Sequence, residues 1–259
     1  MLDELTLIAS RAAAAILAVA RGDLNLRDKA DSSPLTAADE ASELLIRASL
    51  KKMMPDIPVI SEETTGNRLV EGLGRRFFLV DPLDGTREFI SGLEEYTVNI
   101  ALIEDATPVL GVIAAPAYGK IWRGQVGQGA ERLMVSPGDG PQQARERMAL
   151  HTRPCPANGA RVLISRSYPD PATDAYINAL PGATKIVYGS SLKFCVLAEG
   201  LADLYPRLGP ISEWDIAAGH AVLVAAGGQM QRPNGEPMRY GQPEFRVKGF
   251  IASGAISQR

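Results

Sequence analysis

The chain has 259 residues, of which 22% are charged and 46% hydrophobic, and its formal net charge is −3. This length can bury a large core in one domain or in two closely packed domains. The slightly acidic balance argues against a nucleic-acid partner, because such partners are bound through basic patches. A small anionic substrate would have to be held by local cations or by a metal ion.

The first predicted element is a helix over Leu2–Arg21, with apolar residues recurring along one side. Its longest apolar stretch, Ala12–Ala20, is shorter than the roughly 20 residues that span a bilayer. We therefore predict no integral membrane segment and a cytoplasmic protein, with peripheral membrane association left open. Cys155 and Cys195 are the only cysteines, and without metal-ligand spacing they are expected to be free thiols.

Further elements are predicted in chain order through the first half. A loop or short hairpin covers 22–34, a helix covers Thr36–Met54 with Thr36 as its N-cap, and a polar loop after Ser61 runs to Gly74. Strands are predicted at Val59–Ile60, Phe77–Val80, Thr97–Ile103, Val109–Ala114 and Lys120–Trp122.

The composition changes over Pro137–Asn158, which is rich in Pro, Gly, Gln and Arg. This change predicts an N-terminal α+β domain of residues 1–136 and a C-terminal α/β domain of residues 137–259. In the second domain, predicted strands alternate with predicted helices, which indicates a layered α/β unit. The strands are Arg161–Ile164, Lys185–Tyr188, Ala202–Tyr205 and Phe250–Ser253, and the helices are Pro171–Ala179, Ser190–Glu199 and Glu213–Ala226.

The most informative segment is Asp81-Pro82-Leu83-Asp84-Gly85-Thr86, which follows the buried strand. We predict a tight turn here, because Pro82 fixes one backbone dihedral angle and Gly85 lets the chain bend close to a ligand. Two carboxylates three positions apart at the end of a strand can hold divalent metal ions beside a phosphate. The segment therefore predicts a metal-dependent phosphoryl-transfer site.

Three further acidic residues, Asp39, Glu62 and Asp215, each open or follow a regular element. They would complete the oxygen ligands of a two-metal site if the fold brought them together. Each also has a purely structural interpretation. The Thr36-x-x-Asp39 spacing is that of a capping box, Glu62 can be a solvated loop charge, and Asp215 can favour a helix dipole.

The Asp81–Thr86 segment resembles the signature of the inositol monophosphatase superfamily, whose members are Mg²⁺-dependent, lithium-sensitive phosphatases. Trp214–Gly219 followed by Ala226–Gly228 resembles the second signature of that family. Thr36–Asp39 and Ser61–Glu63 match two more family segments in the right order. The resemblance covers nearly the whole chain, and it implies the layered αβαβα sandwich of these phosphatases.

Within the superfamily, the chain resembles the 3'(2'),5'-bisphosphate nucleotidase (CysQ-type) branch, and it departs from that branch at Arg87 and Tyr168. This resemblance implies hydrolysis of adenosine 3',5'-bisphosphate to AMP and phosphate, a reaction of sulfur metabolism. The alternative is an enzyme of the same fold that acts on inositol or another sugar monophosphate. The segments that carry the resemblance are Thr86–Ile90, Tyr96–Ile100, Ile164–Ser167, Gly189–Cys195 and Leu204–Arg207.

The resemblance also implies roles for individual residues. Glu62, Asp81 and the Leu83 carbonyl would hold one Mg²⁺, and Asp81 would bridge to a second ion held by Asp84 and Asp215, with two or three ions in all. Asp39 and Thr86 would orient and deprotonate the attacking water.

The implied substrate-binding residues lie in both halves of the chain. Lys193 and Arg207 would neutralise the second phosphate of the substrate, although each can also be a solvated surface charge. His151 and His220 are interpreted as structural residues. The full substrate-binding set is Glu62, Asp84, Gly85, Thr86, Ser165, Ser190, Ser191, Lys193, Arg207 and Asp215.

Overall fold

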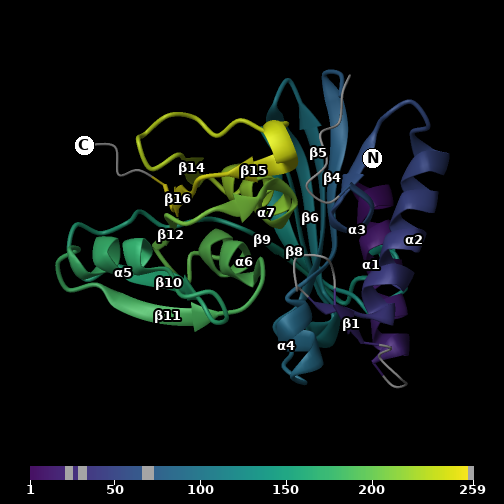
Figure 1. Cartoon of the computed structure of the whole chain (residues 1–259), viewed down its shortest axis with the longest axis horizontal. Helices are drawn as coiled ribbons and strands as arrows, with labels where there is room; N and C mark the ends of the chain where they lie inside the picture. Colours follow the sequence, from purple (N-terminus) through teal and green to yellow (C-terminus); the bar gives the residue numbers. More distant parts are fainter. Residues whose placement is uncertain (21–25, 29–33, 66–72, 256–259) are drawn as a thin grey trace.

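The computed structural model of the chain describes residues 1–20, 26–28, 34–65 and 73–255. Its larger sheet has seven strands in the order β3-β4-β5-β6-β7-β8-β9 (Figure 1). β3 is parallel to β4, and all the other neighbouring strands are antiparallel. The strands are β3 (Val59–Ser61), β4 (Arg76–Asp84), β5 (Thr97–Glu104), β6 (Thr107–Ala115), β7 (Lys120–Gln125), β8 (Gly129–Met134) and β9 (Glu146–Ala149).

Both faces of the seven-stranded sheet are covered, which explains the continuous apolar run in β4. Phe78 and Val80 pack in the core beneath α1 (Leu2–Val19) and α2 (Ala37–Met53). Phe77 and Leu79 belong to the core on the opposite face. Figure 1 shows α1 and α2 lying together on one side of the sheet.

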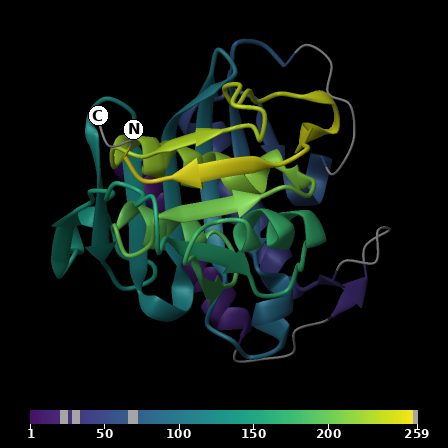
Figure 2. The ribbon, with the colours of Figure 1, turned by 90° about the vertical axis from the view of Figure 1, so that its left-hand side faces the viewer.

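The second sheet has five strands in the order β11-β10-β12-β16-β14, and Figure 2 turns it toward the viewer. β10 is parallel to both β11 and β12, whereas β16 is antiparallel to β12 and β14. The strands are β10 (Arg161–Ser165), β11 (Thr184–Tyr188), β12 (Leu204–Arg207), β14 (Gln229–Gln231) and β16 (Phe250–Ser253).

Helices α6 (Leu192–Ala198) and α7 (Glu213–Ala225) fill the space between the two sheets. One apolar core joins Leu79 of the larger sheet with Phe194 of α6 and Tyr205 of the smaller sheet. On the outer face of the smaller sheet, α5 (Pro171–Asn178) packs through Ile177. The layers therefore follow one another as helix, sheet, helix, sheet and helix, and the predicted αβαβα sandwich is confirmed.

The predicted helices are present with small shifts at their ends. Thr36 is the N-cap of α2, as predicted, and its hydroxyl accepts a hydrogen bond from the Ala38 N–H at 3.2 Å. The helix predicted at Ser190–Glu199 begins only at Leu192. Within the part of the chain that the structure describes, no helix is both long enough and apolar enough to cross a membrane.

Short elements connect the layers. The loop predicted after Ser61 begins instead with the helix α3, because the acidic residues of its first turn favour a helix N-terminus. The rest of that loop, 66–72, and most of the loop or hairpin predicted for 22–34 lie outside the described residues. These elements are β1 (Arg27–Asp28), β2 (Pro34–Leu35), α3 (Glu62–Thr65), α4 (Thr86–Ile90), η1 (Pro116–Tyr118), η2 (Pro141–Gln143), β13 (Ile211–Ser212), η3 (Pro243–Phe245) and β15 (Arg246–Val247).

Several strands were not predicted from the sequence. β9 is an edge strand in which only Met148 is partly buried, so it lacks the apolar alternation that signals a strand. It pairs with β8, so the larger sheet continues to Ala149, and the chain enters the smaller sheet at Arg161. The division of the chain between residues 136 and 137 stays a prediction.

Candidate active site

The segment Asp81–Thr86 is not the tight turn that was predicted. β4 continues through it to Asp84, and its register with β5 shifts between Asp81 and Asp84. Such a bulge redirects side chains at the end of a strand, and the Leu83 N–H donates a hydrogen bond to Asp81 Oδ1 at 3.0 Å. The bend follows at Gly85, whose φ of +93° and close approach to Glu95 disfavour any other residue.

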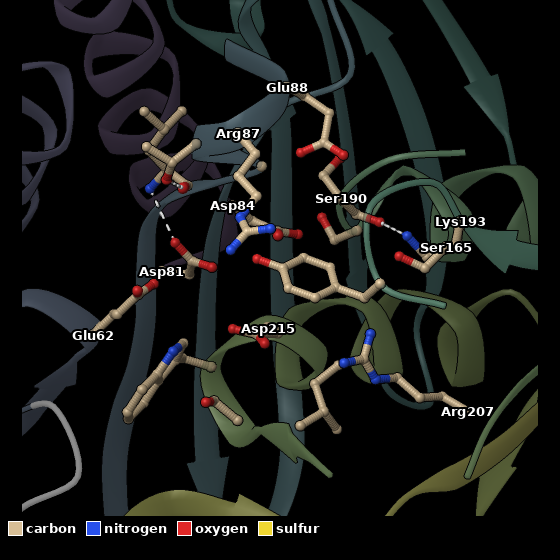
Figure 3. A pocket seen from close by; sticks show the side chains of 18 of the residues that line it. Glu62, Asp81, Asp84, Arg87, Glu88, Ser165, Ser190, Lys193, Arg207 and Asp215 are labelled. Carbon is tan, nitrogen blue, oxygen red and sulfur yellow. Dashed lines mark hydrogen bonds between the residues drawn. The ribbon is translucent and has the colours of Figure 1, made fainter. Parts of the chain in front are cut away.

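An acidic cluster lies where three elements meet. Glu62 opens α3, Asp81 lies on β4 and Asp215 lies in the first turn of α7, and one carboxylate oxygen from each falls within 4.8 Å of the other two. Figure 3 shows the Asp84 carboxylate facing the same space. All four residues, with Leu83, line a cavity of about 640 Å³.

The electrostatics of this cluster suit a bound cation. Burial raises the pKa of Asp84 to about 6, and the ammonium of Lys193 opposes that rise. Burial and the neighbouring Asp84 charge raise the pKa of Asp215 well above its usual range. A divalent cation would stabilise the ionised carboxylates, and carboxylate and carbonyl oxygens are the ligands that hard cations prefer. The residues present therefore fit a metal ion.

Asp39 is both a capping-box residue of α2 and a partner of a cavity-lining residue, which are the two interpretations that its sequence position left open. Its Oδ2 accepts hydrogen bonds from the Thr36 N–H at 2.7 Å and from Thr36 Oγ1 at 2.6 Å, so the capping box exists. Its Oδ1 accepts a hydrogen bond from Thr86 Oγ1 at 3.2 Å. Thr86 lines the cavity, so Asp39 contacts the site through it.

Apart from Asp215, the predicted substrate residues of the second half line the other side of the same cavity (Figure 3). Lys193 is buried, which lowers the pKa of its ammonium to about 8. Its Nζ donates to the carbonyl oxygens of Ser190 at 2.6 Å and Tyr188 at 3.2 Å. Arg207 Nη2 donates to the Pro210 carbonyl at 3.3 Å. Ser165 and Ser190 also line the cavity.

Ser191 lines the cavity, and its side chain is also held by the larger sheet. Its side chain is buried, and its hydroxyl is 2.7 Å from Asn99 Oδ1 and 2.8 Å from Thr97 Oγ1. These contacts anchor the start of α6 to β5. A direct contact between Ser191 and a substrate stays a prediction.

The cavity-lining residues that were not selected as site residues from the sequence include Arg87, Glu88 and Tyr168. The Tyr168 ring lies 5.3 Å from the guanidinium carbon of Arg87 and 5.7 Å from that of Arg207, within cation–π range. The available signal was that Arg87 and Tyr168 depart from the pattern of the resembled branch. Glu88 of α4 accepts a hydrogen bond from Ser167 of the other half, which no local pattern indicates.

The described residues that line the cavity include no histidine and no cysteine. His220 is buried in α7, and its Nδ1 is 2.9 Å from the Tyr240 hydroxyl. His151 is exposed. Cys155 and Cys195 are free thiols, as predicted.

The five-layer sandwich holds a cavity whose acidic cluster could bind a metal ion, and this arrangement fits a phosphoric monoester hydrolase. The profile of the inositol monophosphatase family matches residues 1–257, and the chain belongs to this family. The 3'(2'),5'-bisphosphate nucleotidase CysQ of Shigella flexneri is 41% identical over 98% of this chain and 99% of its own length. The Salmonella typhimurium CysQ is 41% identical over 96% and 98% of the two chains.

A solved structure gives the same result at the level of the fold. The crystal structure of CysQ from Bacteroides thetaiotaomicron is 35% identical and has a TM-score of 0.79, with 95% of this chain and 94% of that chain covered. The predicted likeness to the CysQ-type branch is thereby confirmed.

Proposed function

We propose that this phosphatase uses Mg²⁺ to hydrolyse the 3'-phosphate of adenosine 3',5'-bisphosphate, and that it releases AMP and phosphate. The observation that carries the proposal is a single cavity with an acidic cluster on one side and, among its cationic side chains, Lys193 and Arg207 on the other. A monophosphate ester needs only the metal side, whereas a bisphosphate has a second charged group for the cations. The similarity to CysQ proteins supports the same substrate.

The acidic side would hold two or three Mg²⁺ ions. Glu62, Asp81 and the Leu83 carbonyl would bind one ion, and Asp81, Asp84 and Asp215 would bind a second. Bound Mg²⁺ lowers the pKa of the attacking water and offsets the charge of the phosphate. The Asp81 carboxylate is oriented for this role by the Leu83 N–H.

Asp39 and Thr86 would orient the attacking water and take its proton. The Thr86 hydroxyl has one proton to donate and lies within hydrogen-bonding distance of Asp39 Oδ1 (3.2 Å) and the Leu83 carbonyl (3.1 Å). When that proton points to Asp39, the lone pairs of Oγ1 are left to accept a hydrogen bond from water. The proton then passes from the water through Thr86 to Asp39.

Lys193 and Arg207 would bind the second phosphate. An ammonium has three N–H donors, and Lys193 uses two on the carbonyls of Tyr188 and Ser190, so one remains for an anion. Arg207 has five N–H donors, of which Pro210 takes one. Ser165 and Ser190 would add hydroxyl contacts, and Gly85 and Thr86 would contact the scissile phosphate.

A cytoplasmic location is also part of this proposal. The two free thiols, Cys155 and Cys195, fit a reducing compartment.

The experiment that tests the reaction identifies its products. The protein is incubated with adenosine 3',5'-bisphosphate and Mg²⁺, with a parallel sample in which a chelator replaces the metal. Chromatography against standards should give AMP and one equivalent of phosphate in the first sample only. Formation of adenosine 3'-phosphate, or no turnover, would contradict the proposal.

A further inference from the structure

Glu95, between α4 and β5, connects the two halves of the chain. Its carboxylate accepts hydrogen bonds from Arg166 Nε at 2.8 Å and Arg166 Nη2 at 2.7 Å. It also accepts one from the Gly189 N–H at 2.5 Å. A bidentate arginine–carboxylate pair fixes both distance and orientation. The Glu95 side chain is only 15% exposed, so this pair is partly shielded from water.

The two partners of Glu95 follow neighbouring parallel strands. Arg166 comes directly after β10, and Gly189 comes directly after β11. Loops at the carboxyl ends of adjacent parallel strands lie at one edge of the sheet, where α/β proteins bind ligands. One carboxylate therefore sets the spacing of these two loops and holds both against the seven-stranded sheet.

The same two loops carry proposed substrate contacts. Ser165 precedes Arg166, Ser190 follows Gly189, and both serines line the cavity. Ser190 has a φ of +46°, a conformation that a residue other than glycine keeps only with support from its surroundings. Glu95 packs closely against the neighbouring Gly189, where an added Cβ would lie 3.0 Å from both the Cβ and the backbone oxygen of Glu95.

The Glu95 carboxylate is suited to a permanent anchoring role. Although burial opposes its ionisation, the hydrogen bonds from Arg166 and Gly189 hold the pKa of Glu95 below its usual range. Among the described residues, those that line the cavity do not include Glu95 or Arg166. Any effect of Glu95 on the substrate therefore passes through the loops it holds.

We propose that Glu95 is a positioning residue for substrate selection, which acts through Arg166 and Gly189 to hold Ser165 and Ser190 against the bound nucleotide. This inference rests on the proposed bisphosphate nucleotidase activity. The acidic cluster comes from α3, β4 and α7 and does not depend on Glu95. Loss of Glu95 therefore weakens binding of the nucleotide and spares binding of the phosphate that is cleaved.

The test separates these two parts of the substrate by product inhibition. KM for adenosine 3',5'-bisphosphate and the inhibition constants of AMP and of inorganic phosphate are measured for the wild type, Glu95→Gln, Arg166→Gln and the double variant. In each variant, KM and the inhibition constant of AMP should rise roughly 10- to 100-fold. A displacement of the substrate-contacting residues by about 1 Å can have an effect of this size. kcat and the phosphate constant should change less than about 3-fold. The double variant should match the single variants, because each single substitution already breaks the Glu95–Arg166 ion pair.

Glu94→Gln, which alters the neighbouring exposed carboxylate, is the matched control and should leave all four constants unchanged. If Glu95→Gln does not fold, Arg166→Gln alone carries the test, because that side chain is 39% exposed. Equal rises in the AMP and phosphate constants, or no rise in either, would overturn the role of Glu95. A wild-type protein that does not hydrolyse the bisphosphate would overturn the proposed function and this inference with it.

Discussion

Asp39 and Thr86 are 47 positions apart in the sequence, and a hydrogen bond of 3.2 Å joins Thr86 Oγ1 to Asp39 Oδ1. The other carboxylate oxygen of Asp39 is held by the backbone and hydroxyl of Thr36 at the start of α2. The helix cap therefore fixes the carboxylate that contacts the cavity-lining threonine. A fixed orientation is what a proton acceptor requires.

This relationship predicts that the Thr86 hydroxyl matters for turnover. Thr86→Ala should lower kcat roughly 100- to 1,000-fold with little change in KM, because the path from water to Asp39 is broken. Thr86→Ser keeps the hydroxyl and should retain activity within about tenfold of the wild type. Steady-state phosphate release checks both variants, and an alanine variant with wild-type kcat would rule out the proton path.

Asp84 is expected to be essential for catalysis but not for folding. Asp84→Asn removes one negative charge and one strong oxygen ligand, so Mg²⁺-dependent turnover should fall by roughly a thousandfold or more. The melting temperature should stay close to that of the wild type. Phosphate release and thermal unfolding are measured together, with the exposed Asp139→Asn as control. Unchanged activity in Asp84→Asn would remove this residue from the metal site.

Lithium should inhibit the enzyme at millimolar or lower concentration. Li⁺ is a small hard cation, and a cluster of carboxylates offers it the same oxygen ligands as Mg²⁺. The measurement is phosphate release in LiCl against KCl at matched ionic strength and fixed Mg²⁺. Full activity at far higher lithium concentrations would argue against lithium binding at the acidic cluster.

We expect His220 to make the stability of the protein depend on pH. Burial lowers the pKa of His220 from 6.5 to about 4. Between these values the unfolded chain binds a proton that the folded protein does not, so stability falls as the pH drops from about 6.5 to about 4. At roughly 1.4 kcal/mol per pKa unit, the free energy of unfolding loses about 3 kcal/mol across that window.

Urea unfolding at pH 7.5 and pH 4.5 tests this contribution. His220→Asn replaces the titrating ring, so the stability gap between wild type and variant should narrow at pH 4.5 by most of that amount. The exposed His151→Asn serves as control and should show no such change. An equal gap at both pH values would show that His220 does not titrate as described.

The acidic half of the cavity was predicted through the resemblance to the family signatures at Asp81–Thr86 and Trp214–Gly219, because local patterns alone left open whether the acids meet. Asp81 and Asp84 end an apolar strand, and Asp215 lies at the start of a helix. The predicted tight turn was wrong because Asp84 still pairs with Thr97 of β5, which extends the strand through a bulge. Pairing across strands is not visible in the segment itself.

Contacts between the halves of the chain could not be predicted. Glu95 and Arg166 are 71 positions apart, and each has the sequence context of an ordinary surface charge. Glu88 and Ser167 are 79 positions apart, and their hydrogen bond depends on how α4 meets the loop after β10. Only the packed sandwich brings such pairs together. Their roles therefore emerge from the fold rather than from any motif.

The most direct test of the proposed function is the ratio of kcat/KM for adenosine 3',5'-bisphosphate to that for inositol 1-phosphate, both measured in Mg²⁺. Lys193 and Arg207 offer charged donors to a second phosphate that the inositol ester lacks. The ratio should be at least roughly 100 in favour of the bisphosphate. A higher kcat/KM for inositol 1-phosphate would contradict the proposed function.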